Sequence, residues 1–184
     1  VPGHKGLLGP QGIGAMLLSP ELAQQLTPLI AGGTGSASDS EELPEWMPDR
    51  FESGTPNLPG IYGWETALGF IERTGIESLE SHEKDLTARF LDGIAELKNV
   101  CVYGPKCIEG RTGVVSVGFK KRDNAEAAWL LESEYGVLTR CGLHCAPAAH
   151  RSLGSFPEGS VRFSLGYANT ESDVDGALRA IAAL

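Results

Sequence analysis

The segment SVRFSLGYANTESDVD, residues 160–175, changes its hydrophobic period halfway along. Its first part alternates apolar and polar residues, which predicts a strand with one buried face. The residues on that face are Val161, Phe163, Leu165 and Tyr167. Its second part opens with Thr170, and Asp173 follows three residues later as a variant of the capping box that starts a helix. We expect this helix to bury Val174, Leu178 and Ile181.

The residues before this segment repeat the same two patterns. An apolar stripe with helical spacing runs over residues 79–97, and Gly75 separates it from an earlier helix. Two strands are then predicted, at VCVYG (100–104) and GVVSVGF (113–119). A helix over 125–134 follows, with Asp123 or Asn124 as its N-cap, and after it a strand at GVLTR (136–140). Residues 61–184 therefore predict a small α/β sandwich, with one layer of helices on a sheet.

Residues 1–60 have a different organisation. IGAMLL (13–18) is a short apolar run bounded by glycines, which predicts a buried strand. Ser19 as N-cap and Pro20 at the first helical position then start a short helix. Residues 31–59 are rich in Gly, Ser, Pro and acidic residues, and so predict a long loop that is functional or disordered.

Charge and composition narrow the possible partners. The chain has 184 residues, of which 41% are hydrophobic and 21% charged, and its formal net charge is −9. We therefore expect neither nucleic acid nor an anionic membrane as a partner. No apolar run reaches the roughly 18 residues of a membrane span, and the first residues lack the apolar stretch of a signal peptide. Four cysteines are too few for a disulfide framework, which favours a reduced, cytoplasmic protein.

Reactive side chains are densest in RCGLHCAPAAH, residues 140–150. Its two cysteines and two histidines are ligands that zinc accepts, but they crowd together, whereas structural zinc sites use two separated pairs. The alternative is a nucleophilic Cys145, because Arg140 and His144 are positive neighbours that favour a thiolate. Pro147 and the nearby glycines favour an exposed loop. Taken alone, the segment fits a buried inert cysteine equally well.

Three other features are ambiguous by themselves. Arg162 points away from the apolar face of its predicted strand, where it is either a solvated charge or a carboxylate clamp. GGTGS (32–36) is either a flexible turn or a loop that offers N–H groups and a hydroxyl to a phosphate. GHKGLLGPQGIG (3–14) sets Lys5 beside a histidine among glycines, and most such lysines are surface charges.

Together these segments resemble one family. GHKGLLGPQGIG, GGTGS, PDRFESGTPNLPGI, TRCGLHCAPAAHRSLG and VRFSLGYANTESDVD follow the order found in the C-terminal half of cysteine desulfurases and selenocysteine lyases. These are pyridoxal 5'-phosphate (PLP) enzymes with the class V aminotransferase fold, PLP fold type I. The resemblance implies that residues 1–60 are the end of the PLP-binding large domain with a long active-site loop. It also implies that residues 61–184 are the small domain that carries the reactive cysteine, and that the protein is a homodimer.

The resemblance implies a set of cofactor-binding residues. Lys5, next to His4, matches the lysine that forms the Schiff base with PLP. A lysine amine reacts with the PLP aldehyde, and the ring then accepts the charge left when the substrate loses its Cα proton. Gly33 and Thr34 match the loop that reaches across the dimer to the phosphate of the partner's cofactor.

The resemblance also implies the substrate site. Cys145 matches the nucleophile that takes sulfur from L-cysteine as a persulfide, leaving L-alanine, and His144 beside it would assist proton transfer. Arg162 and Arg140 match arginines that bind the substrate, and Asn57 is a candidate polar contact. The persulfide would pass to a sulfur-acceptor protein, and no metal is implied.

The chain departs from the family at its start. Only four residues precede Lys5, where the family has about half of its length, including an aspartate for the pyridine nitrogen and a ring stacked on the cofactor. We therefore expect a fragment that is weak or inactive by itself. Two alternatives remain: a selenocysteine lyase or other class V aminotransferase-like enzyme, and a non-catalytic zinc-binding or interaction fragment.

Overall fold

A computed structural model describes all of residues 1–184, which form two compact units, Val1–Gly75 and Ile76–Leu184. The units meet in the chain at Gly75, which ends one helix with a φ of 87° before the next begins. This confirms the predicted break between the two helices. The predicted boundary after residue 60 comes earlier, since the first unit also contains the helix that follows it.

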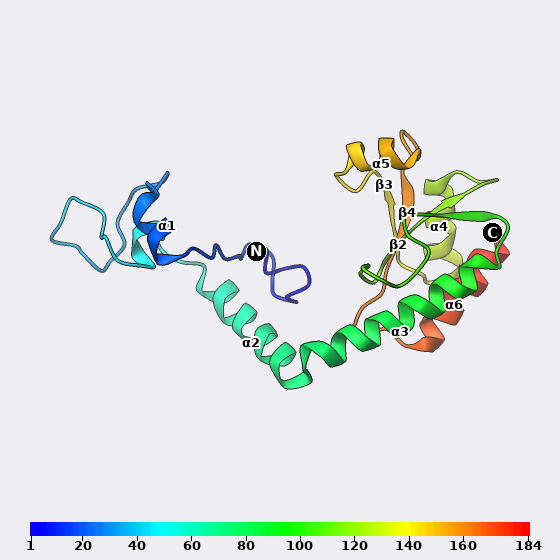
Figure 1. The fold of residues 1–184 in the computed structure, drawn as a ribbon, viewed down its shortest axis with the longest axis horizontal. Coiled ribbons are helices and arrows are strands. Elements are labelled where there is room, and N and C mark those ends of the chain that lie inside the picture. Colours follow the sequence, from blue (N-terminus) through cyan, green and yellow to red (C-terminus); the bar gives the residue numbers. More distant parts are fainter. The chain divides into compact units, whose positions relative to one another are not determined.

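Unit 2 is built on one antiparallel sheet (Figure 1). Its strands are β1 (Val100–Tyr103), β2 (Val114–Phe119), β3 (Arg140–Gly142) and β4 (Ser160–Ser164), in the spatial order β1-β2-β4-β3. Its helices are α3 (Ile76–Ala95), α4 (Asn124–Tyr135), α5 (Pro147–Leu153) and α6 (Glu171–Ala183). The predicted strands at 100–104 and 113–119 and the helix at 125–134 are confirmed.

The core of unit 2 lies between one face of the sheet and its helices. Val115 and Val117 of β2 and Val161 of β4 are fully buried, because alternate strand residues point to the same face. Phe163 packs against Phe90 of α3, with ring centroids 5.0 Å apart and the ring planes tilted by 40°. Helices α3 and α6 lie side by side in this layer (Figure 1). The α/β fold with a single helical layer is therefore confirmed.

Local capping chemistry places α6 and α4 where the sequence predicts them. The Asp173 N–H donates to Thr170 Oγ1 (3.3 Å), and the Thr170 N–H donates to Asp173 Oδ2 (2.8 Å), which completes a capping box. The Oδ1 atom of Asp123 accepts from the first N–H groups of α4. Each cap satisfies donors that the first helical turn cannot pair internally.

Three expectations for unit 2 are corrected. Residues 136–139 of GVLTR form no strand, because Gly136 caps α4 in the left-handed region and β3 begins only at Arg140. Strand β4 ends at Ser164, where the Gly166 N–H donates to Asn169 Oδ1 and turns the chain, so Tyr167 is half exposed. The stretch after Cys145 is not all loop, since Pro147 opens the helix α5.

Unit 1 holds two helices and much irregular chain. Helix α1 (Pro20–Gln25) begins with the predicted Ser19 cap, and α2 (Leu58–Thr74) follows a loop that includes a 3₁₀ turn at Asp49–Phe51. The predicted strand at 13–18 is wrong: only an isolated bridge, Pro2 to Gly14, forms there, and Leu17 is 79% exposed. A strand needs a neighbour along its length for its backbone groups, and here residues 1–3 pair only with residues 13–15, through the Gly3 N–H to the Ile13 carbonyl and the Ala15 N–H to the Val1 carbonyl.

None of the helices combines the length and apolar character that crossing a membrane requires.

Candidate functional site

Cys145 lies in a short loop, residues 143–146, between β3 and α5; we call it the cysteine loop. The thiol is free and the residue is exposed, which favours the exposed-loop alternative over a buried cysteine. His144 and Cys145 have φ angles of 52° and 60°, in the left-handed region. This region costs a non-glycine residue roughly 1–2 kcal/mol. Two such residues in succession indicate a loop whose shape is imposed by its surroundings, a feature common at functional sites.

Strand β4 supplies the contacts that hold this loop. Ser160, at the start of β4, is fully buried, and its hydroxyl lies 3.3 Å from Nε2 of His144. Gly159 comes so close to the backbone of Gly142 that a side-chain Cβ there would approach it to less than 3.0 Å. The loop is therefore anchored through both a side-chain contact and tight backbone packing.

Two arginines face each other on the sheet surface opposite the core. Arg140 of β3 and Arg162 of β4 are register partners, and Ser116 of β2 lies on the other side of Arg162. Side chains in such a pair start about 5 Å apart, and like charges in this position repel. Neither arginine forms an ion pair, and the buried Nε of Arg162 has no hydrogen-bond partner. The arrangement is suited to an anion that bridges both guanidinium groups.

The charge state of His144 follows from these neighbours. Partial burial lowers the pKa of His144 below its ordinary 6.5, and the charge of Arg162 lowers it further, with smaller contributions from His150 and Arg140. The hydrogen bond at Ser160 opposes this shift. His144 is therefore neutral at neutral pH, and its buried Nδ1 has no partner. A neutral imidazole with a free nitrogen can accept a proton.

The other cysteine and histidine of the RCGLHCAPAAH segment have structural surroundings. Burial raises the pKa of the Cys141 thiol, so this residue stays protonated. His150 is buried, and its Nδ1 lies 2.7 Å from the Ser155 hydroxyl. The rings of His144 and His150 are 5.7 Å apart. No group of three or more His, Cys, Asp or Glu side chains is placed to hold a metal ion, so the zinc alternative finds no support in this geometry.

Lys5 lies in unit 1, on a turn of glycine-rich chain. Its carbonyl accepts from the Leu8 N–H (2.9 Å), and its side chain is exposed with no ion pair. The Gly3 and Gly9 positions press against Trp64 of α2, where a Cβ at Gly9 would come within 2.6 Å of the indole ring. These glycines therefore allow the turn that carries Lys5 to pack on α2.

The remaining predicted residues of unit 1 lie in neighbouring loops. Asn57 caps α2 through its Oδ1, which accepts from the Gly60 N–H, and its amide donates to the Gly12 carbonyl (3.1 Å). The Gly33 carbonyl accepts from the Gly54 N–H, and the Thr34 hydroxyl is 2.9 Å from that of Ser36. His4 is exposed next to Lys5. The binding roles predicted for these residues stay predictions.

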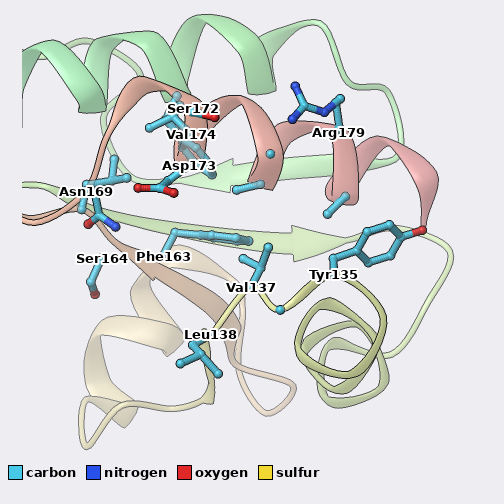
Figure 2. A pocket seen from close by; sticks show the side chains of 16 residues that line it. Tyr135, Val137, Leu138, Phe163, Ser164, Asn169, Ser172, Asp173, Val174 and Arg179 are labelled. Carbon is cyan, nitrogen blue, oxygen red and sulfur yellow. The ribbon is translucent and has the colours of Figure 1, made fainter.

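Unit 2 also contains a cavity of about 760 Å³, which is lined by residues other than those of the cysteine loop and the two arginines. Figure 2 shows its apolar floor, with Phe163 below α6 and with Val137 and Leu138 on the chain that follows α4. None of the predicted site residues lines it. In unit 2 the candidate site is therefore the sheet face with the two arginines and the cysteine loop.

Sequence reasoning missed the contribution of Ser160. The residues next to Ser160 in the sequence do not distinguish it from any other polar residue that precedes an apolar strand. Its role depends on a contact with His144, sixteen residues away, which only the pairing of β3 with β4 creates.

Comparison with known proteins shows the family of the chain. Residues 1–176 match the model of the family described as aminotransferase class-V. A probable cysteine desulfurase of Pyrococcus abyssi is 34% identical over 177 residues, which are 94% of this chain and 43% of that protein. A cysteine desulfurase of Cronobacter sakazakii is 34% identical over 94% of this chain and 42% of that protein.

Solved structures show the same relationship. The apo structure of the cysteine desulfurase from Thermococcus onnurineus NA1 matches with a TM-score of 0.90 and 33% identity, over 99% of this chain and 45% of that one. The cysteine desulfurase CsdA from Escherichia coli, with an S-sulfonic acid, matches with a TM-score of 0.82 and 28% identity, over 98% of this chain and 44% of that one. The chain thus spans less than half the length of these relatives.

Proposed function

Because the chain belongs to the aminotransferase class-V family, we propose that it supplies the lysine and the cysteine of a PLP-dependent cysteine desulfurase. The proposed reaction converts L-cysteine to L-alanine and leaves the sulfur as a persulfide on Cys145. The observation that carries the proposal is the exposed Cys145 in the strained loop that follows β3. The first residue of β3, Arg140, faces Arg162 of β4, and this pair lacks an anionic partner.

The two arginines would bind the carboxylate of the substrate. The Arg162 guanidinium is half-buried and has an unused Nε donor, which suits a charge-assisted hydrogen bond to a carboxylate. The more exposed Arg140 across the strand pair adds a second positive charge. Binding an anion here relieves the repulsion between the two side chains, so substrate binding also stabilises the sheet face.

Cys145 would then take the sulfur. Its thiolate attacks the sulfur atom of L-cysteine, so that a sulfur–sulfur bond forms while the carbon–sulfur bond breaks and its electron pair passes to the substrate carbon. Neutral His144, adjacent in the chain, is suited to accept the thiol proton beforehand. The exposure of Cys145 leaves the resulting persulfide accessible to a sulfur acceptor.

Lys5 fits the role of cofactor lysine. Its amine is exposed and free of ion pairs, as reaction with an aldehyde requires. Lys5 would hold PLP, with His4 beside it and with Gly33 and Thr34 contributing to a phosphate contact. When bound, PLP supplies an electron sink for the carbanion formed at the substrate Cα. Lys5 itself would move the proton to and from that carbon.

Three further parts of the proposal concern the assembly. We propose a homodimer, supported by the apolar residues that unit 1 leaves exposed, among them Leu29 and Ile30. A sulfur-acceptor protein would take the persulfide sulfur. A reducing compartment such as the cytoplasm would suit the chain, since all four of its cysteines are free.

The experiment that tests the function uses the holoenzyme that contains this chain, purified with PLP. Alanine formation from L-cysteine, and sulfide release in the presence of a reductant, are measured for Cys145→Ser and for the matched control Cys107→Ser, which removes another exposed thiol. We expect Cys145→Ser to lose about 100-fold or more of the activity and Cys107→Ser to keep it. Equal activity of the two variants would refute the role of Cys145.

The substrate is tested in parallel. Arg162→Ala should raise KM for L-cysteine about 10- to 100-fold, because a charged hydrogen bond to the carboxylate is lost. Comparing sulfide from L-cysteine with selenide from L-selenocysteine then separates a desulfurase from a selenocysteine lyase. A Cys145→Ser enzyme that keeps full activity on selenocysteine but not on cysteine would identify the lyase.

A further inference from the structure

A groove lies at the edge of unit 2 that is farthest from the cysteine loop. It is formed by the C-terminal part of α3 and the residues just after it, together with the edge strand β1, and has a volume of about 390 Å³. Its floor is apolar, with Leu91, Ile94, Leu97, Val100 and Val102. Because the sheet order is β1-β2-β4-β3, this edge and the strand that leads into the cysteine loop lie at opposite sides of the sheet.

The charged residues that line this groove are all positive. They are Lys98, Lys106 and Lys120, and no acidic residue lines it. None of the three forms an ion pair. In a chain whose net charge is −9, such a cluster is a local exception. Its positive potential attracts carboxylates, whereas the net negative charge of the chain disfavours their approach in general.

The strand in this groove has an unused edge. β1 pairs only with β2, so the backbone N–H and C=O groups on its other side have no strand partner. Such an edge either accepts a further strand or is protected from doing so, and lysines are a common protection. An apolar floor next to the edge favours the first outcome, since it offers pockets for alternate side chains of an added strand.

The lysines are placed at the two ends of β1. Lys120 lies at the start of the strand: its N–H donates to the Asn99 carbonyl (2.9 Å) and its ammonium donates to the Lys98 carbonyl (3.0 Å). Lys106 follows the other end, after Tyr103. A four-residue strand spans about 13 Å, so the positive ends match two carboxylates roughly four residues apart on an extended chain.

We propose that this groove, which we call the lysine groove, binds an extended acidic segment of a partner protein by adding it as a strand to β1. Apolar residues of the segment would fill the floor, and acidic residues at its two ends would pair with the lysines. The segment would leave Cys145 uncovered, because it binds at the far edge of the sheet. This proposal does not depend on the cysteine desulfurase reaction.

The test uses the full chain and a capped synthetic peptide, Glu-Val-Thr-Val-Glu, as the probe. Binding is followed by NMR chemical-shift changes and by isothermal titration. We expect shifts at β1 and at the end of α3, a dissociation constant that rises with salt, and no binding of the matched peptide Lys-Val-Thr-Val-Lys. Shifts confined to other regions, equal binding of both peptides, or no binding at all would overturn the proposal.

Variants separate recognition from edge protection. Replacing Lys98, Lys106 and Lys120 by Gln should weaken binding of the acidic peptide about tenfold, the sum of three exposed charge pairs. Lys84→Gln, on the exposed side of α3 in an ion pair with Glu80, is the matched control and should bind as the unchanged chain does. Unchanged binding by the triple variant, or its self-association without any peptide effect, would show that the lysines only protect the edge.

Discussion

Gly159 is the residue whose replacement should damage the cysteine loop most directly. It has a φ of 71°, and a Cβ at this position would meet the backbone C and O atoms of Gly142 at less than 3.0 Å. Gly142 is the last residue of β3 before the cysteine loop. Gly154 offers a matched control, because its φ is also 71° but a Cβ there would meet nothing within 4 Å.

The two glycines allow the steric cost to be separated from the conformational cost. Alanine in the left-handed region costs about 1–2 kcal/mol, and the reduced freedom of the unfolded chain returns about 0.4–1 kcal/mol. Gly154→Ala should therefore destabilise by about 1 kcal/mol. Gly159→Ala adds a clash with backbone, which cannot turn aside as a side chain does, and overpacking of this kind costs about 1–3 kcal/mol more. We expect a total near 3 kcal/mol.

The assay is urea unfolding of each variant, followed by far-ultraviolet circular dichroism. With a slope of about 2 kcal/mol per molar urea, the midpoint of Gly159→Ala should lie about 1 M below that of Gly154→Ala. In the holoenzyme, Gly159→Ala should also lower the proposed desulfurase activity, whereas Gly154→Ala should leave it largely unchanged. Equal midpoints for the two variants would refute the tight packing of β3 against the turn before β4.

Three other changes have expected outcomes. Phe90→Ala should lower the free energy of unfolding by about 3–5 kcal/mol in urea titrations, because the buried ring and its contact with Phe163 are lost. A loss below about 1 kcal/mol would place the ring outside the core. Thr170→Ala should cost about 1 kcal/mol in the same titrations by removing the cap of α6, and no change would contradict the capping box with Asp173. The pKa of His144 is lower in the folded than in the unfolded state. The unfolded chain therefore takes up the proton more readily, and the free energy of unfolding falls as pH drops below about 6.5. His144→Gln should therefore lose less stability than the unchanged chain between about pH 7.5 and about pH 5, and identical pH profiles would contradict this.

Local chemistry explains which elements could be predicted. Thr170 and Asp173, three residues apart, define the start of α6 through their capping box, and the Asp123 side chain caps the start of α4. The strand at 100–104 is similarly visible in its composition. The run at 13–18 misled because a strand needs a neighbour along its whole length, and within the chain only residues 1–3 pair with its first part.

Some features of the candidate site could likewise be predicted from the sequence, and others could not. The reactive residue types near Cys145, and the family that they resemble, follow from the order of side chains in the segment around it. The left-handed conformation of His144 and Cys145 does not, because it accompanies contacts with distant residues, Ser160 with His144 and Gly159 with Gly142. Nor could spacing reveal that Arg140 and Arg162 are opposite each other, since they are neighbours only in the register of β3 with β4.

The sequence by itself determined every α-helix except α5, three of the four strands apart from their ends, the family and the identity of the reactive side chains. These depend on caps, periodicity and residues close in the chain. The tertiary structure alone decided which side chains face one another. Register pairs Arg140 with Arg162, Ser160 holds His144, and burial leaves Cys141 protonated while Cys145 is exposed. Each of these is a long-range effect, in which the charge or position of one group depends on residues that only the folded sheet brings near.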